Sequence, residues 1–192
     1  MENFNQLIQA QFGQLSSDEL GIIRSYFHEE VLKKGDLFTQ TDQICNRLSI
    51  IKEGLLRVYA YADGKDITQW ISTPHYLITE IMGFFFDQPN RWNIQALTDT
   101  TLLTITKSNY DKLCDEIPKW KDIEKQFIVR CFATIEDRVF THLSMTAAER
   151  YDLYYAHNQD LFNQVPLRYI ASVLGMTPET FSRIRKQKMG VS

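Results

Sequence analysis

The sequence has few cysteines and no long apolar run. Its three cysteines, Cys45, Cys114 and Cys131, are far apart and odd in number. No Cys-x-x-Cys pair accompanies them, so the sequence predicts neither a disulfide framework nor a zinc site. No run of about 18 apolar residues occurs, and we expect no membrane-spanning helix. Residues 1–6 lack the basic start and apolar core of a signal peptide. We therefore expect a protein of the reducing cytoplasm.

The usual motifs of enzymes are also missing. The sequence has no Gly-rich phosphate loop and no nucleophile motif. Its four histidines lie on scattered segments without the spacing of a metal site, and are His28, His75, His142 and His157. These absences argue against an enzyme and against a metal-using sugar-binding β-roll. We predict no catalytic residue and no metal ligand.

Charge is unevenly distributed along the chain. The 192 residues carry a net charge of −3. Residues 166–192 contain five basic residues and one acidic residue, a net +4, so the residues before them carry −7. A basic end on an acidic body is the electrostatic footprint of a module that meets nucleic-acid phosphate. The 44% hydrophobic composition is otherwise that of a globular protein.

The segment 166–186 predicts two short helices joined by a tight turn. Its apolar positions follow helical spacing and are Ile170, Ala171, Leu174, Phe181 and Ile184. Gly175 stands where the turn needs positive φ, and Thr177 can cap the second helix ahead of Pro178. This pattern is typical of a helix-turn-helix, although an ordinary corner between two helices shares it. The local charge favours DNA binding.

The rest of the chain alternates between helical and strand-like periods. Phe4 to Phe12 and the stretch after Ser16 or Ser17 are predicted helices. Short β-type runs with turn residues between them occur at 30–32, 37–38, 47–51, 55–61, 67–71 and 94–105. Asp63-Gly64 is a hairpin signal. Helices return after Ser108 and after Thr146, and 158–165 is expected to be a loop or short turn. The fold class is therefore α+β, with a small antiparallel β-roll.

Residues 119–145 contain no glycine or proline and predict one long helix. One apolar stripe comprises Trp120, Ile123, Phe127, Cys131, Ile135, Val139 and Leu143, and a second comprises Ile128, Phe132 and Phe140. One stripe suffices to pack on the roll. The other favours contact with the same helix of a second copy, with Ile123, Phe127, Cys131, Ile135 and Val139 as the dimer-helix residues. A helix sandwiched within its own chain is the alternative.

The predicted order is helices, a β-roll, one long helix and a helix-turn-helix. In this order the chain resembles the catabolite-activator/FNR (Crp/Fnr) family of bacterial transcription regulators. Its glycine turns match that family at Lys34-Gly35-Asp36, Lys52-Glu53-Gly54 and Asp63-Gly64-Lys65. The run Ile170-Ala171-x-x-Leu174-Gly175-x-x-x-x-Thr180-x-Ser182-Arg183 is similar to the family's DNA-binding signature.

The resemblance implies three parts. They are an effector-binding roll like a cyclic-nucleotide-binding domain (a double-stranded β-helix) with flanking helices at 1–117, a dimerisation helix at 118–145 and a helix-turn-helix domain at 146–192. The implied partners are double-stranded DNA, a second copy of the chain, RNA polymerase and a small effector, with no membrane. The alternative is an effector-binding or scaffold protein that lacks sequence-specific DNA binding.

The expected DNA-binding residues lie on or beside the second helix of the motif. They are Arg168, Thr177, Glu179, Thr180, Ser182, Arg183 and Lys186. We expect Arg183 to reach guanine with two hydrogen bonds and Glu179 to accept from a cytosine amino group. Arg168, Lys186 and Lys188 are expected to meet phosphate. The family continues into a wing, whereas six residues follow Lys186 in this sequence, so we expect a reduced wing.

The expected effector pocket comprises Thr79, Glu80, Asn90 and Arg91. Glu80 matches the family glutamate that holds the ribose, but Thr79 replaces a glycine and Asn90-Arg91 replaces an Arg-Ser pair. A phosphate needs close backbone approach and a positioned cation, so we expect cyclic nucleotides to bind weakly or not at all. Glu80 and Arg91 could instead pair with each other.

The sequence also lacks the residues that would hold the other cofactors with which this family senses signals. An iron–sulfur sensor needs about four cysteines, and no supporting pattern surrounds the histidines that could hold haem. The effector is an unknown small molecule, or there is none.

Overall fold

The computed structural model describes residues 4–188 and Gly190. The predicted α+β class is confirmed. The described strands are β1 His28–Leu32, β2 Leu37–Thr39, β3 Arg47–Glu53, β4 Leu56–Ala62, β5 Lys65–Ser72, β6 Leu77–Ile78, β7 Asn93–Ala96 and β8 Thr100–Thr106. The helices are α1 Phe4–Phe12, α2 Ser17–Tyr26, α3 Ile81–Phe86, α4 Lys107–Glu116, α5 Trp120–Ser144, α6 Ala147–His157, α7 Leu161–Gln164, α8 Leu167–Val173 and α9 Pro178–Lys188.

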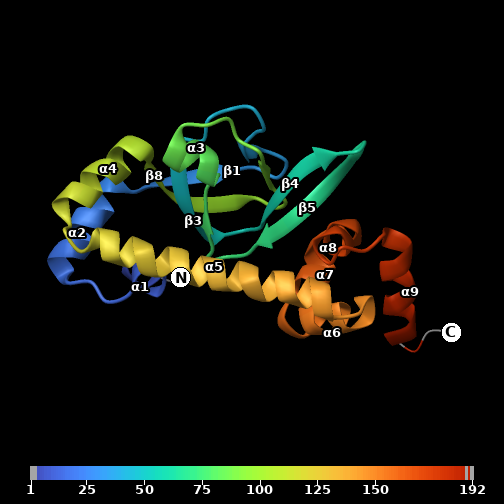
Figure 1. Cartoon of the computed structure of the whole chain (residues 1–192). Coiled ribbons are helices and arrows are strands. Elements are labelled where there is room, and N and C mark those ends of the chain that lie inside the picture. Colours follow the sequence, from blue (N-terminus) through green and yellow to red (C-terminus); the bar gives the residue numbers. More distant parts are fainter. Residues whose placement is uncertain (1–3, 189, 191–192) are drawn as a thin grey trace.

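The strands form two four-stranded antiparallel sheets, in the orders β1-β8-β3-β6 and β2-β7-β4-β5. Strands β4 and β5 pair as a hairpin whose turn holds Asp63 and Gly64 at positive φ, as the Asp-Gly signal predicts. This hairpin extends beyond the rest of the roll toward the helical C-terminal part (Figure 1). Apolar side chains fill the roll, and this cluster is Leu32, Phe38, Cys45, Ile51, Leu56, Ile78, Ile94, Ala96 and Leu102.

Helices α1, α2 and α4 gather at one end of the roll with the start of α5 (Figure 1). Ser16 and Glu19 form a reciprocal capping box at the start of α2, which settles which serine caps that helix. Trp120 is buried there, with its ring 4.8 Å from that of Phe12. The predicted cap of α4 is wrong by two residues: Thr106, not Ser108, accepts the Asn109 N–H at 3.3 Å.

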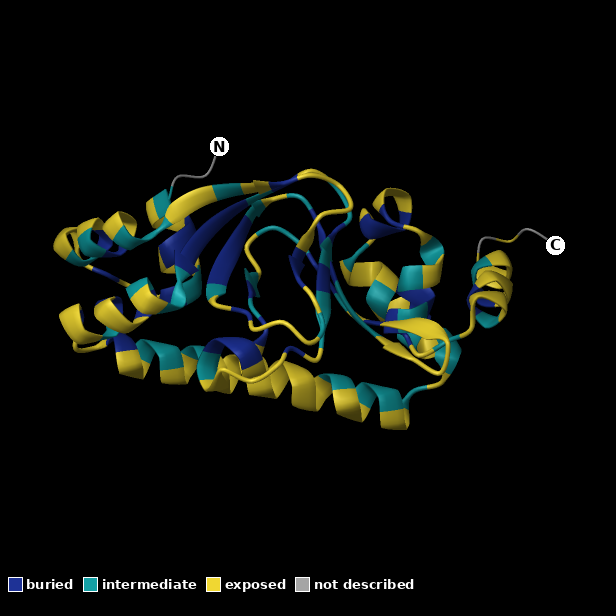
Figure 2. Ribbon diagram, turned by 90° about the horizontal axis from the view of Figure 1, so that it is seen from above, coloured by how far each residue is buried: buried dark blue, intermediate teal, exposed yellow. Residues whose placement is uncertain are grey.

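The long helix α5 agrees with its predicted bounds to within one residue at each end. It crosses below the roll and ends at the C-terminal helices (Figure 1). From its middle onward most of its surface is exposed (Figure 2). The expectation that one whole stripe packs on the roll is wrong, because Ile135, Val139 and Leu143 are exposed together with Phe132 and Phe140. The roll faces another side of the helix here, because Arg138 on the same turns lies 5.1 Å from the centre of the Trp70 ring of β5.

The C-terminal helices α6 to α9 share one core, and that core includes Leu55 and Ile71 of the roll. The Ser172 hydroxyl of α8 accepts the Thr68 N–H of β5 at 2.8 Å. The helical part is thus packed on the β4–β5 hairpin. Helix α6 starts after Thr146, as predicted, and the structure adds that Thr146 and Glu149 form a reciprocal capping box.

Two short elements were not predicted from the sequence. Helix α3 and strand β6 lie in the 74–92 region, where the run Phe84-Phe85-Phe86 has neither helical nor strand periodicity. The segment 158–165, expected to be a loop or turn, contains the four-residue helix α7. The expected reduced wing concerns the end of the chain, where 189, 191 and 192 lie outside the described residues.

Candidate nucleic-acid interface and effector pocket

The turn between α8 and α9 has the geometry that the sequence predicts. Gly175 has φ of +65°, and its N–H donates to the Ser172 carbonyl at 3.0 Å. Thr177 caps α9, because its hydroxyl accepts the Thr180 N–H at 3.2 Å. Phe181 and Ile184 are buried, so α9 is held by its inner face. Two short helices with a glycine turn and a shared core make a helix-turn-helix arrangement.

The outer face of α9 carries most of the residues expected to contact DNA. The exposed ones are Arg168, Thr177, Glu179, Ser182, Arg183 and Lys186, and Thr180 is half-buried. The backbone N–H of Glu179 and the Thr177 hydroxyl lower the pKa of the Glu179 carboxyl, which is therefore an ionised acceptor. Arg168 lies against its neighbour, with its guanidinium 5.1 Å from the Tyr169 ring centre. These exposed groups are of the kinds that contact phosphate and base edges.

Lys188, one of the residues expected to contact phosphate, is already paired with a carboxylate. The Lys188 ammonium lies 2.7 Å from the Asp152 carboxylate of α6. Both side chains are about half exposed, so this is a surface ion pair of small net stability. Lys188 can contact DNA only if it leaves Asp152, whereas Lys186 is exposed and has no ion pair among residues 4–188 and Gly190. Of these two lysines, Lys186 is the better phosphate contact.

In the roll, the expected effector residues are engaged by other groups of the chain. Glu80 is 3% exposed and caps α3, accepting the Gly83 N–H at 2.8 Å. Its other oxygen accepts the Arg91 backbone N–H at 3.3 Å, so Glu80 and Arg91 do meet, but through the backbone and not through the guanidinium. The Arg91 guanidinium lies 5.0 Å from the Trp92 ring centre instead. Thr79 donates its hydroxyl hydrogen to the Arg47 carbonyl at 2.9 Å.

The fourth residue of this set, Asn90, closes the space around Gly83. Its side-chain oxygen accepts the Cys45 N–H at 3.0 Å, and its amide nitrogen donates to the Gln40 carbonyl at 3.0 Å. A Cβ added to Gly83 would lie 2.3 Å from that Asn90 oxygen and 2.5 Å from the Cys45 nitrogen. The site therefore does not fit a cyclic nucleotide: the Glu80 carboxylate expected at the ribose is engaged by α3 and Arg91, and Asn90 places a packed amide where a cation would meet the phosphate.

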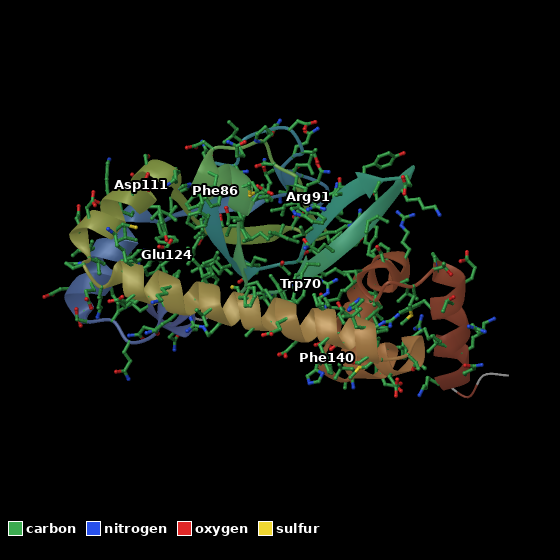
Figure 3. The ribbon with its side chains drawn as sticks, viewed as in Figure 1. Trp70, Phe86, Arg91, Asp111, Glu124 and Phe140 are labelled. Atoms are coloured by element: carbon green, nitrogen blue, oxygen red, sulfur yellow. The ribbon has the colours of Figure 1, made fainter. Side chains whose placement is uncertain are left out.

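The five expected dimer-helix residues divide into two groups. Ile123 packs on the N-terminal core, and the Phe127 ring lies 6.1 Å from that of Phe12, so these two are bound within the chain. Cys131, Ile135 and Val139 are exposed. A continuous exposed face, which we call the α5 apolar face, comprises Ile128, Val129, Phe132, Ile135, Val139, Phe140 and Leu143. Phe140 points away from the roll (Figure 3).

Sequence analysis missed a cavity of about 510 Å³ between the roll, α5, α6 and α8. Its walls include Trp70, Arg138 and Tyr154, which come from three elements distant in sequence. Trp70 interrupts the apolar-polar alternation of β5, and Arg138 interrupts the apolar stripes of α5. These two breaks in the sequence pattern are the signals that could have pointed to the cavity, but neither predicts that a cavity exists.

Among residues 4–188 and Gly190, no group of three or more His, Cys, Asp or Glu side chains could hold a metal ion. The three cysteines are free, with Cys45 buried and Cys131 exposed. None of the described helices is long and apolar enough to cross a membrane.

Comparison with known protein families identifies one domain in this chain. Residues 29–116 match the family model of the cyclic nucleotide-binding domain. No curated protein sequence matches the chain.

Solved structures extend this similarity over nearly the whole chain. A protein from Eubacterium rectale assigned to the Crp/Fnr family of transcriptional regulators has a TM-score of 0.70 at 18% identity, covering 92% of this chain and 85% of that one. The catabolite activator protein of Thermus thermophilus has a TM-score of 0.58 at 21% identity, with coverage of 94% and 88%. The c-di-GMP-responsive regulator CLP of Xanthomonas campestris has a TM-score of 0.66 at 11% identity, with coverage of 91% and 92%. The chain thus has the Crp/Fnr-like regulator fold, built on a cyclic nucleotide-binding domain.

Proposed function

We propose that this protein is a transcription regulator that binds DNA as a homodimer through α8 and α9. The proposal assigns 1–117 to a roll domain that supports the other two parts, 118–145 to dimerisation and 146–192 to DNA binding. The observation that carries it is the two-sided character of α9. Its inner face is buried through Phe181 and Ile184, and its outer face presents Arg183 and Lys186 to solvent.

The exposed face of α9 has suitable chemistry for reading DNA. Arg183 is exposed one turn into the helix, where its planar guanidinium can donate two hydrogen bonds to guanine O6 and N7. The ionised Glu179 can accept from a cytosine amino group. The last turn adds Arg185, Lys186 and Lys188, which raise the positive potential near phosphate.

The α5 apolar face supports a dimer. Phe132 is 67% exposed and Phe140 is 69% exposed, and five other apolar residues adjoin them on the same helix. An exposed apolar surface of this kind marks an interaction site. A second copy of the same helix is the simplest partner, since it would place two reading helices on an inverted repeat.

A cyclic nucleotide is not part of this proposal. The side chains of Glu80 and Asn90 are hydrogen-bonded to backbone N–H groups of this chain, and apolar side chains fill the roll. CLP is named for its response to c-di-GMP, so proteins with this fold are not restricted to one effector. We propose that the roll of this chain is a structural support for α5 and the β4–β5 hairpin.

Selection of duplexes from a random library by the purified protein tests the proposal. We expect an enriched inverted repeat whose half-sites are about 34–36 Å apart, or a multiple of that distance. The double variant Arg183→Ala/Lys186→Ala should retain the fold and lose the enrichment. Equal binding of selected and random duplexes at physiological salt would contradict the proposal and favour a scaffold role for the protein.

A further inference from the structure

The cavity of about 510 Å³ lies where all three parts of the chain meet. The roll contributes Trp70 and Tyr76, α5 contributes Arg138, α6 contributes Tyr154, and the end of α8 contributes Leu174. Figure 3 shows Trp70 at the edge of the roll beside α5. The volume is in the range of cavities that hold small organic ligands, about 300–1,000 Å³.

The arginines of the walls outnumber the acidic residues. Two arginines and two histidines line the cavity, and Asp137 is the one carboxylate among the lining residues. The Arg138 guanidinium donates to the Val173 carbonyl at 3.2 Å. That bond uses one of the five N–H donors of the group. Arg150 is held by the Leu174 and Met145 carbonyls at 3.0 and 2.8 Å, which fixes a second positive charge beside the cavity.

Tyr154 adds a hydroxyl to this cationic wall. Burial raises the pKa of Tyr154 to about 12, so the hydroxyl keeps its proton and can donate it in a hydrogen bond. Burial also lowers the pKa of Arg138, but an arginine side chain stays protonated in proteins. Both groups are therefore hydrogen-bond donors at neutral pH.

The remaining walls are flat and apolar. The Trp70 and Tyr76 rings have their centres 6.1 Å apart, and the Arg138 guanidinium lies 5.1 Å from the centre of the Trp70 ring. Ile71, Leu153 and Val173 complete this side. An aromatic ring beside a fixed guanidinium suits a ligand with a flat apolar body and an anionic group.

We propose that this cavity binds a small organic anion, with its carboxylate or phosphate against Arg138 and Tyr154 and its flat apolar body against Trp70. The site differs from the effector position around Glu80, and none of the residues expected to form that pocket lines it. A ligand here would touch the roll, α5, α6 and the end of α8 at once. The inference does not depend on DNA binding, so it is tested without DNA.

The test titrates the full-length protein with 1-naphthoate and, separately, with 1-naphthyl phosphate, and follows tryptophan fluorescence and calorimetric heat. We expect saturable binding of at least one anion. The neutral 1-naphthamide should bind about tenfold more weakly than naphthoate, because a charged hydrogen bond is lost. This comparison uses the unaltered protein and does not depend on the folding of any variant.

Variants then locate the site. Arg138→Gln should weaken binding of the anion by about tenfold or more, and Tyr154→Phe by about threefold or more. Trp70→Phe should remove the fluorescence response and keep the calorimetric heat. Arg130→Gln is the matched control on α5, because Arg130 bonds the Gln11 carbonyl outside the cavity, and it should bind the probe like the unaltered protein.

Naphthamide and naphthoate binding with equal affinity, or equal losses in Arg138→Gln and Arg130→Gln, would overturn the inference. Absence of binding by both anions at millimolar concentration would overturn it as well. A protein that selects an operator but binds neither probe keeps its proposed function and lacks this site. A protein that binds a probe in the expected pattern but selects no operator has the site without the function.

Discussion

The guanidinium carbon of Arg57 lies 3.8 Å from the centre of the Tyr169 ring, and this contact joins strand β4 of the roll to helix α8 of the helix-turn-helix. Arg57 is buried, with the Tyr59 ring 4.1 Å from the same carbon. Its Nη1 lies 3.2 Å from the Asp66 carboxylate, and its Nε donates to the Thr68 hydroxyl at 2.9 Å. Helix α8 is thus held on the hairpin by a cation between two aromatic rings.

Tyr169→Leu should weaken this attachment. A desolvated cation–π contact is worth about 2 kcal/mol, so we expect the free energy of unfolding to fall by about 1–2 kcal/mol, with faster hydrogen exchange in α8. Urea unfolding and exchange measurements check this. Tyr61→Leu at the exposed end of the hairpin is the matched control and should change the stability by less than about 0.5 kcal/mol. Equal effects of the two changes would show that Tyr169 contributes only general packing.

Cyclic AMP and cyclic GMP should give no saturable heat in calorimetry. Glu80 is 3% exposed and already accepts the Gly83 and Arg91 N–H groups, so a ribose hydroxyl would have to reach a buried carboxylate that is engaged within the chain. Glu80→Ala should instead destabilise the protein by about 1–2 kcal/mol, because the cap of α3 is lost. A micromolar dissociation constant that Glu80→Ala abolishes would contradict this and restore a nucleotide-binding role for the roll.

Lysines on the α5 apolar face should give monomers. The change Ile135→Lys/Phe140→Lys places two charges where the proposed partner helix would exclude water, and sedimentation at micromolar concentration should show the loss of the dimer and of specific DNA binding. Thr134→Lys is the control, because position 134 is exposed and lies about 100° around the helix from Ile135 and about 120° from Phe140. A monomeric unaltered protein, with and without DNA, would refute the dimer.

The two basic residues of α9 should differ in what they recognise. Arg183→Ala should cost about 1–3 kcal/mol per half-site and relax the preference at one base pair. Lys186→Ala should weaken binding to all sequences alike. The slope of the logarithm of the binding constant against the logarithm of the salt concentration should become shallower by about one per lost phosphate contact. Lys188→Ala should change the slope less than Lys186→Ala, since Lys188 already pairs with Asp152. Salt titrations on selected and random duplexes separate these effects. Equal losses on both duplexes for Arg183→Ala would make Arg183 a phosphate contact.

Acid should weaken the contact between α2 and α5. The Lys119 ammonium and the Ser16 N–H bond the Glu19 carboxylate and lower its pKa from 4.5 to about 2. A group whose pKa is lower in the folded state stabilises the protein above its unfolded pKa, and this stabilisation is lost as the pH falls from about 4.5 to about 2. Glu19→Gln should therefore flatten the fall in stability over that range. Urea unfolding at about pH 7 and about pH 3 measures it, and an unchanged pH dependence would exclude Glu19.

Local patterns in the sequence predicted most elements, because caps and turns depend on neighbouring residues. Thr146 with Glu149 starts α6, Asp63-Gly64 turns the hairpin, and Gly175 ends α8. The two-sided pattern around Phe181 and Ile184 also predicted which face of α9 is exposed. These features need no knowledge of the distant chain.

Long-range packing decided what local patterns left open. Glu80 could hold a ligand or pair with Arg91, and only the folded roll shows that it caps α3 and accepts the Arg91 N–H. The two stripes of α5 are equally apolar in sequence, but the core that includes α1, α2 and α4 covers only residues of the first turns, so Ile135, Val139 and Leu143 are exposed. The cavity beside Trp70 exists because β5, α5, α6 and α8 meet there. Contacts between residues far apart in sequence are set by how the elements pack, so only the tertiary structure could decide them.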